Sequence, residues 1–585
     1  MRLKNRRMSR VKLIAVLATL ALLVAACGDD EEESVTTAAA QPDTTTATTA
    51  AAEPTPETTT ATTRATTTTT AAPEMEEEEE EMEEEEEEME EEVTETTQAG
   101  PTRVEGGILR MVIGTEPKSL NPSIATSRFA QQISRGIIDV LMEKDVNNHP
   151  EPSGLITAYE QVDGLTWRFT VREGVSFHNG EPFNAEAAAA SVRANRDTGG
   201  LRVYFTLIAD AQAIDDTTFE IITTTETGIG LLPALLTETF VFPPAYLAEV
   251  GADEFGLAPV GTGPLVFEEW IPGERISASA NPDYWNGAPT LDGVEWTWAP
   301  DANTRLALLQ TGDADMIVTL SPQLFDDVEA DDNLVLSAAP GGNKFFMGMN
   351  IHAPPMDDIR LRQAIAHAID REALVGGVLE GRGGIANPNA FHNFFSSTGR
   401  HADDYYPYDP DRARELVAEV QAEGDIPPIP INYTVGRYIS DKDMGEAVVG
   451  MLEAVGLPLE ARALEPGEFI VALFTNQLGG THQLPFDVRY PHEDVFMRTT
   501  FTSAGLVKAC TSDRLDELAT IGATAQTEEE RIAAYSEVER IVLIDLVCWV
   551  SIYDQVDNFA YTTGLGGFHQ RLDLQIDYEG LYFQE

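Results

Sequence analysis

The stretch Met356-Asp357-Asp358-Ile359-Arg360-Leu361-Arg362-Gln363-Ala364-Ile365, which continues to Ala368-Ile369-Asp370-Arg371, predicts an amphipathic helix. Ile359, Ile365 and Ile369 mark the buried side of a helix over 358–370. Asp357 stands where its carboxylate can accept hydrogen bonds from free backbone N–H groups, so it is the predicted N-cap. A helix with one apolar side must pack on another element, which places this segment in a folded domain.

Further helices and strands are predicted on both sides of this stretch. Asp409 and Pro410 are a predicted N-cap and first helical residue, and Asn184 caps a predicted helix over 185–196. A later helix shows one apolar face that ends at a glycine: Met444, Val448, Met451, Leu452, Val455 and then Gly456. Residues 108–113 and 166–171 predict strands, and Gly261, Gly263 and Pro264 predict a tight entry into a strand, with glycine permitting positive φ.

Five short blocks occur in the order that one family of bacterial proteins shows. They are residues 172–186, 260–292, 305–315, 356–371 and 408–413. Together they resemble the family-5 extracellular solute-binding proteins, the dipeptide, oligopeptide and nickel-binding type that serves ABC importers. Asn179 stands where the family usually has Asp. One block is weak evidence, whereas five in order are specific.

The resemblance implies an α/β fold of the two-lobed, periplasmic-binding-protein-like (type II) class, with an extra subdomain in the first lobe. The implied boundaries are lobe I at 104–149, the subdomain at 150–258, lobe I again at 259–343, lobe II at 344–552 and a return to lobe I at 553–585. Such lobes close on a ligand by hinge motion.

The first hundred residues predict an export signal, a lipid anchor and a spacer. Residues 1–26 combine a basic start with an apolar run too short to span a bilayer comfortably. The sequence Val24-Ala25-Ala26-Cys27-Gly28 resembles the lipobox of bacterial lipoproteins, so Cys27 is the predicted anchor on the outer face of the cytoplasmic membrane. A short transmembrane anchor and an ordinary secretory cleavage are the alternatives. Residues 27–103, rich in Thr, Ala, Glu and Pro, predict a disordered stalk because they cannot bury enough apolar surface.

The net charge of −60 and the three cysteines exclude some classes of function. An acidic surface repels phosphate backbones, which excludes nucleic acid as a partner. The cysteines show no C-x-x-C spacing and no grouping with histidine that suggests zinc. Cys510 and Cys548 are the two that remain after lipidation, and export to an oxidising compartment predicts a disulfide between them. A free, buried Cys548 is the alternative.

No motif indicates an enzyme. The sequence holds no G-x-S-x-G, no H-E-x-x-H, no P-loop and no Rossmann fingerprint. His178 has no second His or Cys near it, which favours a hydrogen-bonded loop histidine over a metal ligand. We expect no cofactor and no metal. A binding protein is therefore predicted, and a secreted hydrolase is the alternative from another class.

The resemblance also indicates ligand-binding residues. Peptide-binding members hold the ligand's ammonium group with an Asp in a G-W-x-x-D-Y-x-x-P loop, and residues 484–491 are the matching stretch. Here Phe486 takes the Trp place, Arg489 stands at the Asp, Tyr490 follows, and Asp487 lies two residues before Arg489. Arg489 can offer a bidentate fork to a carboxylate, which would reverse the charge of the site. A salt bridge to Asp487 or Glu493, or a register shift that restores Asp487, is the alternative.

Four further positions and one loop asparagine complete the candidate site. Thr115 and Glu116 follow the first strand, Phe345 and Phe346 lie at the crossing between the lobes, and Asn389 follows a glycine-rich turn. Aromatic residues at the crossing can equally pack the hinge.

We therefore predict a monomeric, lipid-anchored extracellular solute-binding protein. It captures a peptide-like or other small organic solute, anionic solutes included, in the interlobe cleft and delivers it to an ABC permease. A binder of nickel or metal chelates and a ligand sensor are the alternatives within this class.

Overall fold

The computed structural model describes residues 102–125, 127–145, 147–198, 200–385, 390–391, 405–487 and 490–585. They belong to one compact unit, Thr97–Glu585. Cys27, the predicted leader and residues 27–101 of the predicted stalk lie outside the described residues, whereas Arg103, at the predicted end of the stalk, lies in a strand paired with Gln584. Within the described residues, no helix has both the length and the apolar character needed to span a bilayer.

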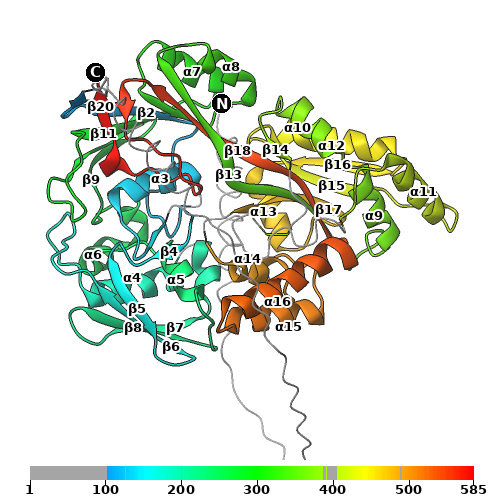
Figure 1. Ribbon diagram of the computed structural model, residues 1–585, viewed down its shortest axis with the longest axis horizontal. Helices are drawn as coiled ribbons and strands as arrows, with labels where there is room; N and C mark the ends of the chain where they lie inside the picture. Colours follow the sequence, from blue (N-terminus) through cyan, green and yellow to red (C-terminus); the bar gives the residue numbers. More distant parts are fainter. Residues whose placement is uncertain are drawn as a thin grey trace, which may run out of the picture. The chain divides into compact units, whose positions relative to one another are not determined.

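One large sheet runs through most of this unit (Figure 1). Its strand order is β16-β15-β17-β13-β18-β12-β2-β11-β10-β9, and β14 also pairs with β18. The strands are β2 Ile108–Ile113, β9 Leu265–Ile271, β10 Arg275–Ala280, β11 Gly293–Trp298, β12 Met316–Val318, β13 Leu334–Met349, β14 Gly384–Ile385, β15 Ile429–Thr434, β16 Leu459–Leu464, β17 Thr481–Asp487 and β18 Trp549–Thr562. The predicted strand over 108–113 is confirmed.

Two long antiparallel strands, β13 and β18, join the two ends of this sheet (Figure 1). β18 pairs with β12 on one side, and β13 pairs with β17 on the other. We call the group β2 and β9–β12 lobe I, and the group β15–β17 lobe II. Because these two strands carry the chain between the lobes, they are the natural place for a hinge.

A separate four-stranded sheet, the subdomain, has the order β5-β6-β8-β7. Its elements are β5 Ile156–Gln161, β6 Thr166–Val171, β7 Ile208–Ala213, β8 Thr218–Thr223, the 3₁₀ helix η1 Gly200–Phe205, and helices α4 Ala185–Asp197, α5 Leu231–Leu236 and α6 Pro244–Phe255. Phe169 and Phe219 stack at 5.2 Å between ring centroids in its core. That core is continuous with the core of lobe I.

The remaining helices flank the two lobes. The helices in the chain segments of lobe I are α3 Arg128–Ile137, α7 Ala302–Gln310 and α8 Phe325–Glu329. The helices in the chain segments of lobe II are α9 Ile359–Ala368, α10 Arg371–Val378, α11 Pro410–Gln421, α12 Asp441–Ala454, α13 Pro466–Phe474, α14 Glu493–Thr500, α15 Asp513–Thr524 and α16 Glu528–Arg540. Short strands pair as β3 Glu143–Lys144 with β4 Pro150–Glu151, and β20 Tyr582–Gln584 pairs with both β1 Arg103–Val104 and β19 Leu565–Gly566.

Helix α9 differs in detail from the helix predicted over 358–370. α9 begins at Ile359, and Asp358 caps it by accepting a hydrogen bond from the Arg360 N–H, so Asp357 was the wrong N-cap. Ile365 and Ile369 are buried as expected. Ile359 is 37% exposed, because the first residue after the cap precedes the turn that packs on the core. The caps predicted at Asn184 and Asp409 are confirmed.

Gly261 and Gly263 are required for a different reason than predicted. Neither has positive φ; instead a Cβ atom would lie 2.1 Å and 2.7 Å, respectively, from backbone atoms of Ile137. The same loop holds His178, whose Nε2 lies 3.0 Å from the Gly263 carbonyl and whose Nδ1 accepts from the Gly261 N–H. His178 is therefore a hydrogen-bonded loop histidine, as predicted.

Cys510 and Cys548 form a disulfide, with 5.8 Å between their Cα atoms. Both lie in a buried apolar cluster of lobe II that also contains Trp549 and Phe346. The bond attaches the segment that carries α15 and α16 to the start of β18.

Candidate functional site

Three strands of lobe II end at one edge of the sheet. β15 is parallel to β16 and to β17, with Ile431 paired to Thr481 and Asn432 to His482. Continuing this register places the loop after β15 beside residues 485–487 of β17. In open α/β sheets, ligands bind outside the carboxyl ends of parallel strands. This edge is therefore the place where a site is expected.

The loop after β15 is fixed by one buried carboxylate. Asp441, only 5% exposed, accepts hydrogen bonds from the backbone N–H groups of Gly436, Arg437 and Tyr438 at 2.9, 2.9 and 3.2 Å, and from the Thr434 hydroxyl at 2.9 Å. The Asp441 carboxylate therefore has its hydrogen-bond partners within the loop, and these bonds fix the loop conformation.

Arg437 projects from this rigid loop. Its guanidinium lies 5.2 Å from the centroid of the Tyr438 ring, and its Nε donates to the Tyr438 hydroxyl at 2.7 Å. The Tyr438 ring packs edge-on against Phe345 at 5.0 Å. Among the described residues, no carboxylate lies within ion-pair distance of Arg437, and the side chain is exposed. Its two terminal nitrogens thus form an oriented fork of the kind that binds carboxylates.

Phe345 and Phe346 are packing residues of the hinge. Phe345 is 2% exposed and stacks on Tyr553 at 4.5 Å, while Phe346 is fully buried and packs against Trp549 at 5.2 Å. Neither ring offers a surface to a solute. The structure thus favours hinge packing over the ligand contact that the sequence also allowed, because both rings face apolar cores on opposite sides of β13.

The loop after β2 lies at the carboxyl end of a parallel strand of lobe I. Thr115 is exposed there and remains a candidate. Glu116 does not, since its Oε1 accepts hydrogen bonds from Trp270 Nε1 and from the Gly273 N–H, both at 3.0 Å. The carboxylate is used to attach the loop to the β9–β10 hairpin. Lys118, in the same loop, is exposed.

The predicted segment 484–491 is described only in part. The backbones of Phe486 and Asp487 lie in β17, opposite Lys344 and Asn343, while their side chains, Arg489 and Asn389 lie outside the described residues. Tyr490 is 5% exposed, and its ring lies 4.8 Å from that of Tyr204 in η1 of the subdomain. The segment therefore reaches the subdomain at Tyr490.

A buried charge cluster lies under the crossing strands. Lys344 is fully buried, with its Nζ 3.6 Å from Asp554 Oδ1. Glu539 of α16 is 1% exposed and accepts hydrogen bonds from the N–H groups of Ala390 and Phe391. Burial raises the pKa of Glu539 to about 8 and lowers the pKa of Lys344 to about 8. The cluster belongs to the interior, where burial favours the neutral form of both groups.

We expect Glu539→Gln to flatten the pH dependence of stability. Because the pKa of Glu539 is higher in the folded chain than in the unfolded one, the wild type loses stability as pH rises from about 4.5 to 8. Above pH 8 the variant should be more stable than the wild type by about 2–4 kcal/mol. Urea unfolding at pH 5, 7 and 9 measures this. Glu537→Gln, on the same helix but paired with Arg514 at the surface, is the control and should keep the wild-type slope.

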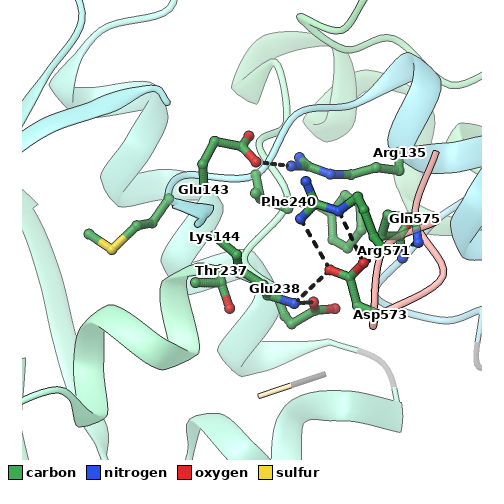
Figure 2. Close-up of a pocket in the computed structure, with 11 residues that line it drawn as sticks. Arg135, Glu143, Lys144, Thr237, Glu238, Phe240, Arg571, Asp573 and Gln575 are labelled. Carbon is green, nitrogen blue, oxygen red and sulfur yellow. Dashed lines mark hydrogen bonds and ion pairs between the residues drawn. The ribbon is translucent and has the colours of Figure 1, made fainter. Parts of the chain in front are cut away.

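A second cluster encloses a cavity of about 10 Å³, room for one water molecule (Figure 2). Figure 2 shows that its charges pair with one another: Arg135 with Glu143, and Lys144 with Glu238 and Asp573, the last two at 2.7 and 3.1 Å. The charges are matched and the space is too small for a solute. This cluster stabilises lobe I and is not a ligand site.

No group of three His, Cys, Asp or Glu that could hold a metal ion occurs among the described residues. The nickel alternative has no supporting observation in this part of the chain.

The comparisons with known proteins decide the family. Residues 129–503 match the profile of the bacterial extracellular solute-binding proteins, family 5. This chain belongs to that family. As a family-5 solute-binding protein, it is a binding protein and not an enzyme, which confirms the sequence prediction.

The relatives of this family-5 protein differ in what their names say they bind. The glutathione-binding protein GsiB of Pectobacterium atrosepticum is 31% identical over 316 residues, which cover 53% of this chain and 60% of that protein. AgaA of A. tumefaciens R10, solved with agropinic acid, has a TM-score of 0.71 at 21% identity and covers 82% of this chain and 99% of its own. AppA of Bacillus subtilis, solved with a nonapeptide, has a TM-score of 0.70 at 20% identity and covers 83% and 100%. The two-lobed type II fold is thereby confirmed.

Arg437 is the residue that sequence reasoning missed. The chain reads Tyr433-Thr434-Val435-Gly436-Arg437 at the end of a strand-like run, which is a usable signal for a loop at a carboxyl end. Its importance depends on two facts that only the structure supplies: the parallel pairing of β15 and β17, and the lack of a carboxylate partner among the described residues.

Proposed function

We propose that this family-5 protein captures a carboxylate-bearing, peptide-like solute between lobes I and II and delivers it to an ABC permease, while Cys27 anchors it to the membrane by lipid. The observation that carries the proposal is Arg437, an oriented guanidinium without a carboxylate partner among the described residues. In a chain with a net charge of −60, this exposed guanidinium is a cation that an anionic solute can use.

Other features support an anionic solute. Lys118 adds an exposed cation at the carboxyl end of β2. Arg489, which stands where peptide-binding members have Asp, adds a further cation to segment 484–491 if the predicted register holds. The relative named for glutathione binding and the structural neighbour solved with agropinic acid both take ligands that carry carboxylates.

The proposal for the lipid anchor rests on the sequence of residues 1–28. The apolar run, the small residues before Cys27 and the basic start form the full pattern of a lipoprotein signal. Acyl chains on Cys27 would hold an acidic protein on a membrane that its own surface does not attract. Residues 28–103 would then act as a spacer between the membrane and lobe I.

Arg437→Ala is expected to weaken binding of reduced glutathione by 10- to 100-fold, since a hydrogen bond to a charged group contributes about 1.5–3 kcal/mol. Arg437→Lys keeps the charge but loses the fork and should weaken binding by about fivefold. Isothermal titration calorimetry on the full-length protein measures both.

Arg462→Ala is the matched control for Arg437→Ala. Arg462 lies in the edge strand β16, and its guanidinium is paired with Glu460 at 3.0 Å. Its removal should leave the dissociation constant within twofold of wild type. Equal affinity of Arg437→Ala and wild type for glutathione would exclude Arg437 from the site.

A further inference from the structure

A loop of the subdomain is bonded to lobe II. The Gly228 N–H donates to the Ala523 carbonyl at 2.6 Å, and the Ile229 N–H donates to the Ala525 carbonyl at 2.9 Å. Gly228 and Ile229 follow β8 of the subdomain, whereas Ala523 and Ala525 end α15 and begin the connector to α16. These bonds therefore join the subdomain to the end of α15, where Ala523 also packs in the same buried apolar cluster as the subdomain.

Both sides of this contact are firmly held. The Thr227 carbonyl accepts from Gln161 Nε2 at 2.7 Å, and the Thr227 hydroxyl accepts from Trp167 Nε1 at 2.8 Å, which fixes the loop to β5 and β6. From the other side, Gln526 Nε2 donates to the same Thr227 carbonyl at 3.2 Å and to the Thr524 carbonyl at 2.9 Å. The contact can thus transmit a displacement of one lobe to the other.

Gly228 leaves no space at this contact. A Cβ atom at position 228 would lie 2.2 Å from the Ala525 carbonyl oxygen and 2.7 Å from its backbone nitrogen. The backbone of Gly228 is not in the left-handed region, so alanine is compatible with its conformation. Alanine at 228 would therefore disturb the contact with lobe II and little else.

A histidine and two tyrosines extend the same contact. His492 caps α14 by accepting from the Asp494 N–H at Nδ1, and its ring also hydrogen-bonds to the backbone of Ile229. Tyr490 meets Tyr204 of the subdomain next to it. Burial lowers the pKa of His492 to about 3, so the imidazole is neutral and this bond does not change between pH 5 and 8.

The position of this contact suggests what it does. The subdomain shares its core with lobe I, whereas most buried residues of α14–α16 pack in the lobe II cluster with Trp549, so this contact bridges the two lobes. We propose that residues 227–229 and 523–526, with His492, form a clasp that closes the lobes over the solute and sets how tightly the solute is held. The proposal rests on the proposed function, because a clasp affects affinity only if the solute lies between the lobes.

The contact can be tested separately from binding, because it is made by backbone groups of residues 228, 229, 523 and 525. We expect Gly228→Ala to speed hydrogen–deuterium exchange of segments 225–230 and 521–527 at least threefold in the full-length, ligand-free protein. Gly450→Ala is the control, since a Cβ atom at Gly450, exposed on α12, meets nothing within 4 Å. Unchanged exchange in Gly228→Ala would overturn the clasp.

Binding provides the second readout. Gly228→Ala should raise the dissociation constant for reduced glutathione at least tenfold, and Gln526→Ala two- to fivefold, while Gly450→Ala stays within twofold. Faster exchange with unchanged affinity would show a contact that does not control binding and would overturn the proposal. If glutathione binds neither wild type nor variant, the proposed solute is wrong, and the exchange experiment alone decides the clasp.

Discussion

Asp573→Ala is expected to destabilise the protein by about 3–5 kcal/mol, because it removes the buried carboxylate shared by two largely buried cations, Lys144 and Arg571. Asp573 is 3% exposed. Its carboxylate accepts from Lys144 Nζ at 3.1 Å, from Arg571 Nε at 3.2 Å and from the Gln575 N–H at 3.1 Å. The bond from Lys144 attaches the C-terminal segment to β3. Urea unfolding at pH 7 measures the loss.

The stabilising effect of Asp573 is expected to depend on pH, because its carboxyl group has a shifted pKa. Burial would raise the pKa of Asp573, but the charges of Lys144 and Arg571 outweigh it and hold that pKa well below its usual range. The carboxylate therefore contributes stability above about pH 4, and this contribution is lost as pH falls toward the pKa of the folded state. Wild type should lose more stability between pH 5 and pH 3 than Asp573→Ala.

Asp577→Ala is the control for this variant. Asp577 also pairs with Arg571, at 3.3 Å, but its side chain is 53% exposed. Such exposed pairs contribute at most about 1 kcal/mol. Equal losses for Asp573→Ala and Asp577→Ala would contradict a structural role for the buried network.

Replacing both Cys510 and Cys548 with alanine is expected to cost about 4 kcal/mol of stability. The disulfide spans 38 residues, and closing a loop of that length restricts the unfolded chain by about this amount. The loop contains α15 and α16, which carry one side of the clasp. Guanidinium unfolding of wild type and of the double variant gives the difference.

A reducing agent supplies the matched control for the disulfide. It should lower the unfolding midpoint of wild type toward that of the double alanine variant and leave the variant unchanged. An identical midpoint for the oxidised wild type and the variant would mean that the bond does not stabilise the fold.

Local features of the fold were predictable from the sequence, and features that depend on pairing were not. Asn184 and Asp409 were identified as caps because a cap acts within four residues. The N-cap of α9 was placed one residue early because Asp357 and Asp358 both fit the pattern. The reason for Gly261 and Gly263 was missed, since their close neighbour Ile137 lies more than a hundred residues away in the chain.

The candidate site was harder to predict, because it depends on contacts between residues that are far apart in the sequence. Phe345 and Phe346 lie in β13, which runs between the lobes, and only their burial shows that they pack in apolar cores. Glu116 was a candidate ligand-binding residue in the sequence, but in the structure its carboxylate accepts hydrogen bonds from Trp270 and Gly273. Arg437 carries no family motif, and its position at the site follows from the parallel register of β15 and β17. The roles of Arg489 and Asn389 stay predictions.

The proposed function requires that this protein select its solute by the solute's carboxylates. The most direct test is to titrate the full-length protein by calorimetry with reduced glutathione and with glutathione whose two carboxylates are converted to amides. We predict saturable binding of glutathione and affinity at least tenfold weaker for the diamide. Equal binding of both would contradict carboxylate recognition and return the site to a ligand held by its ammonium group.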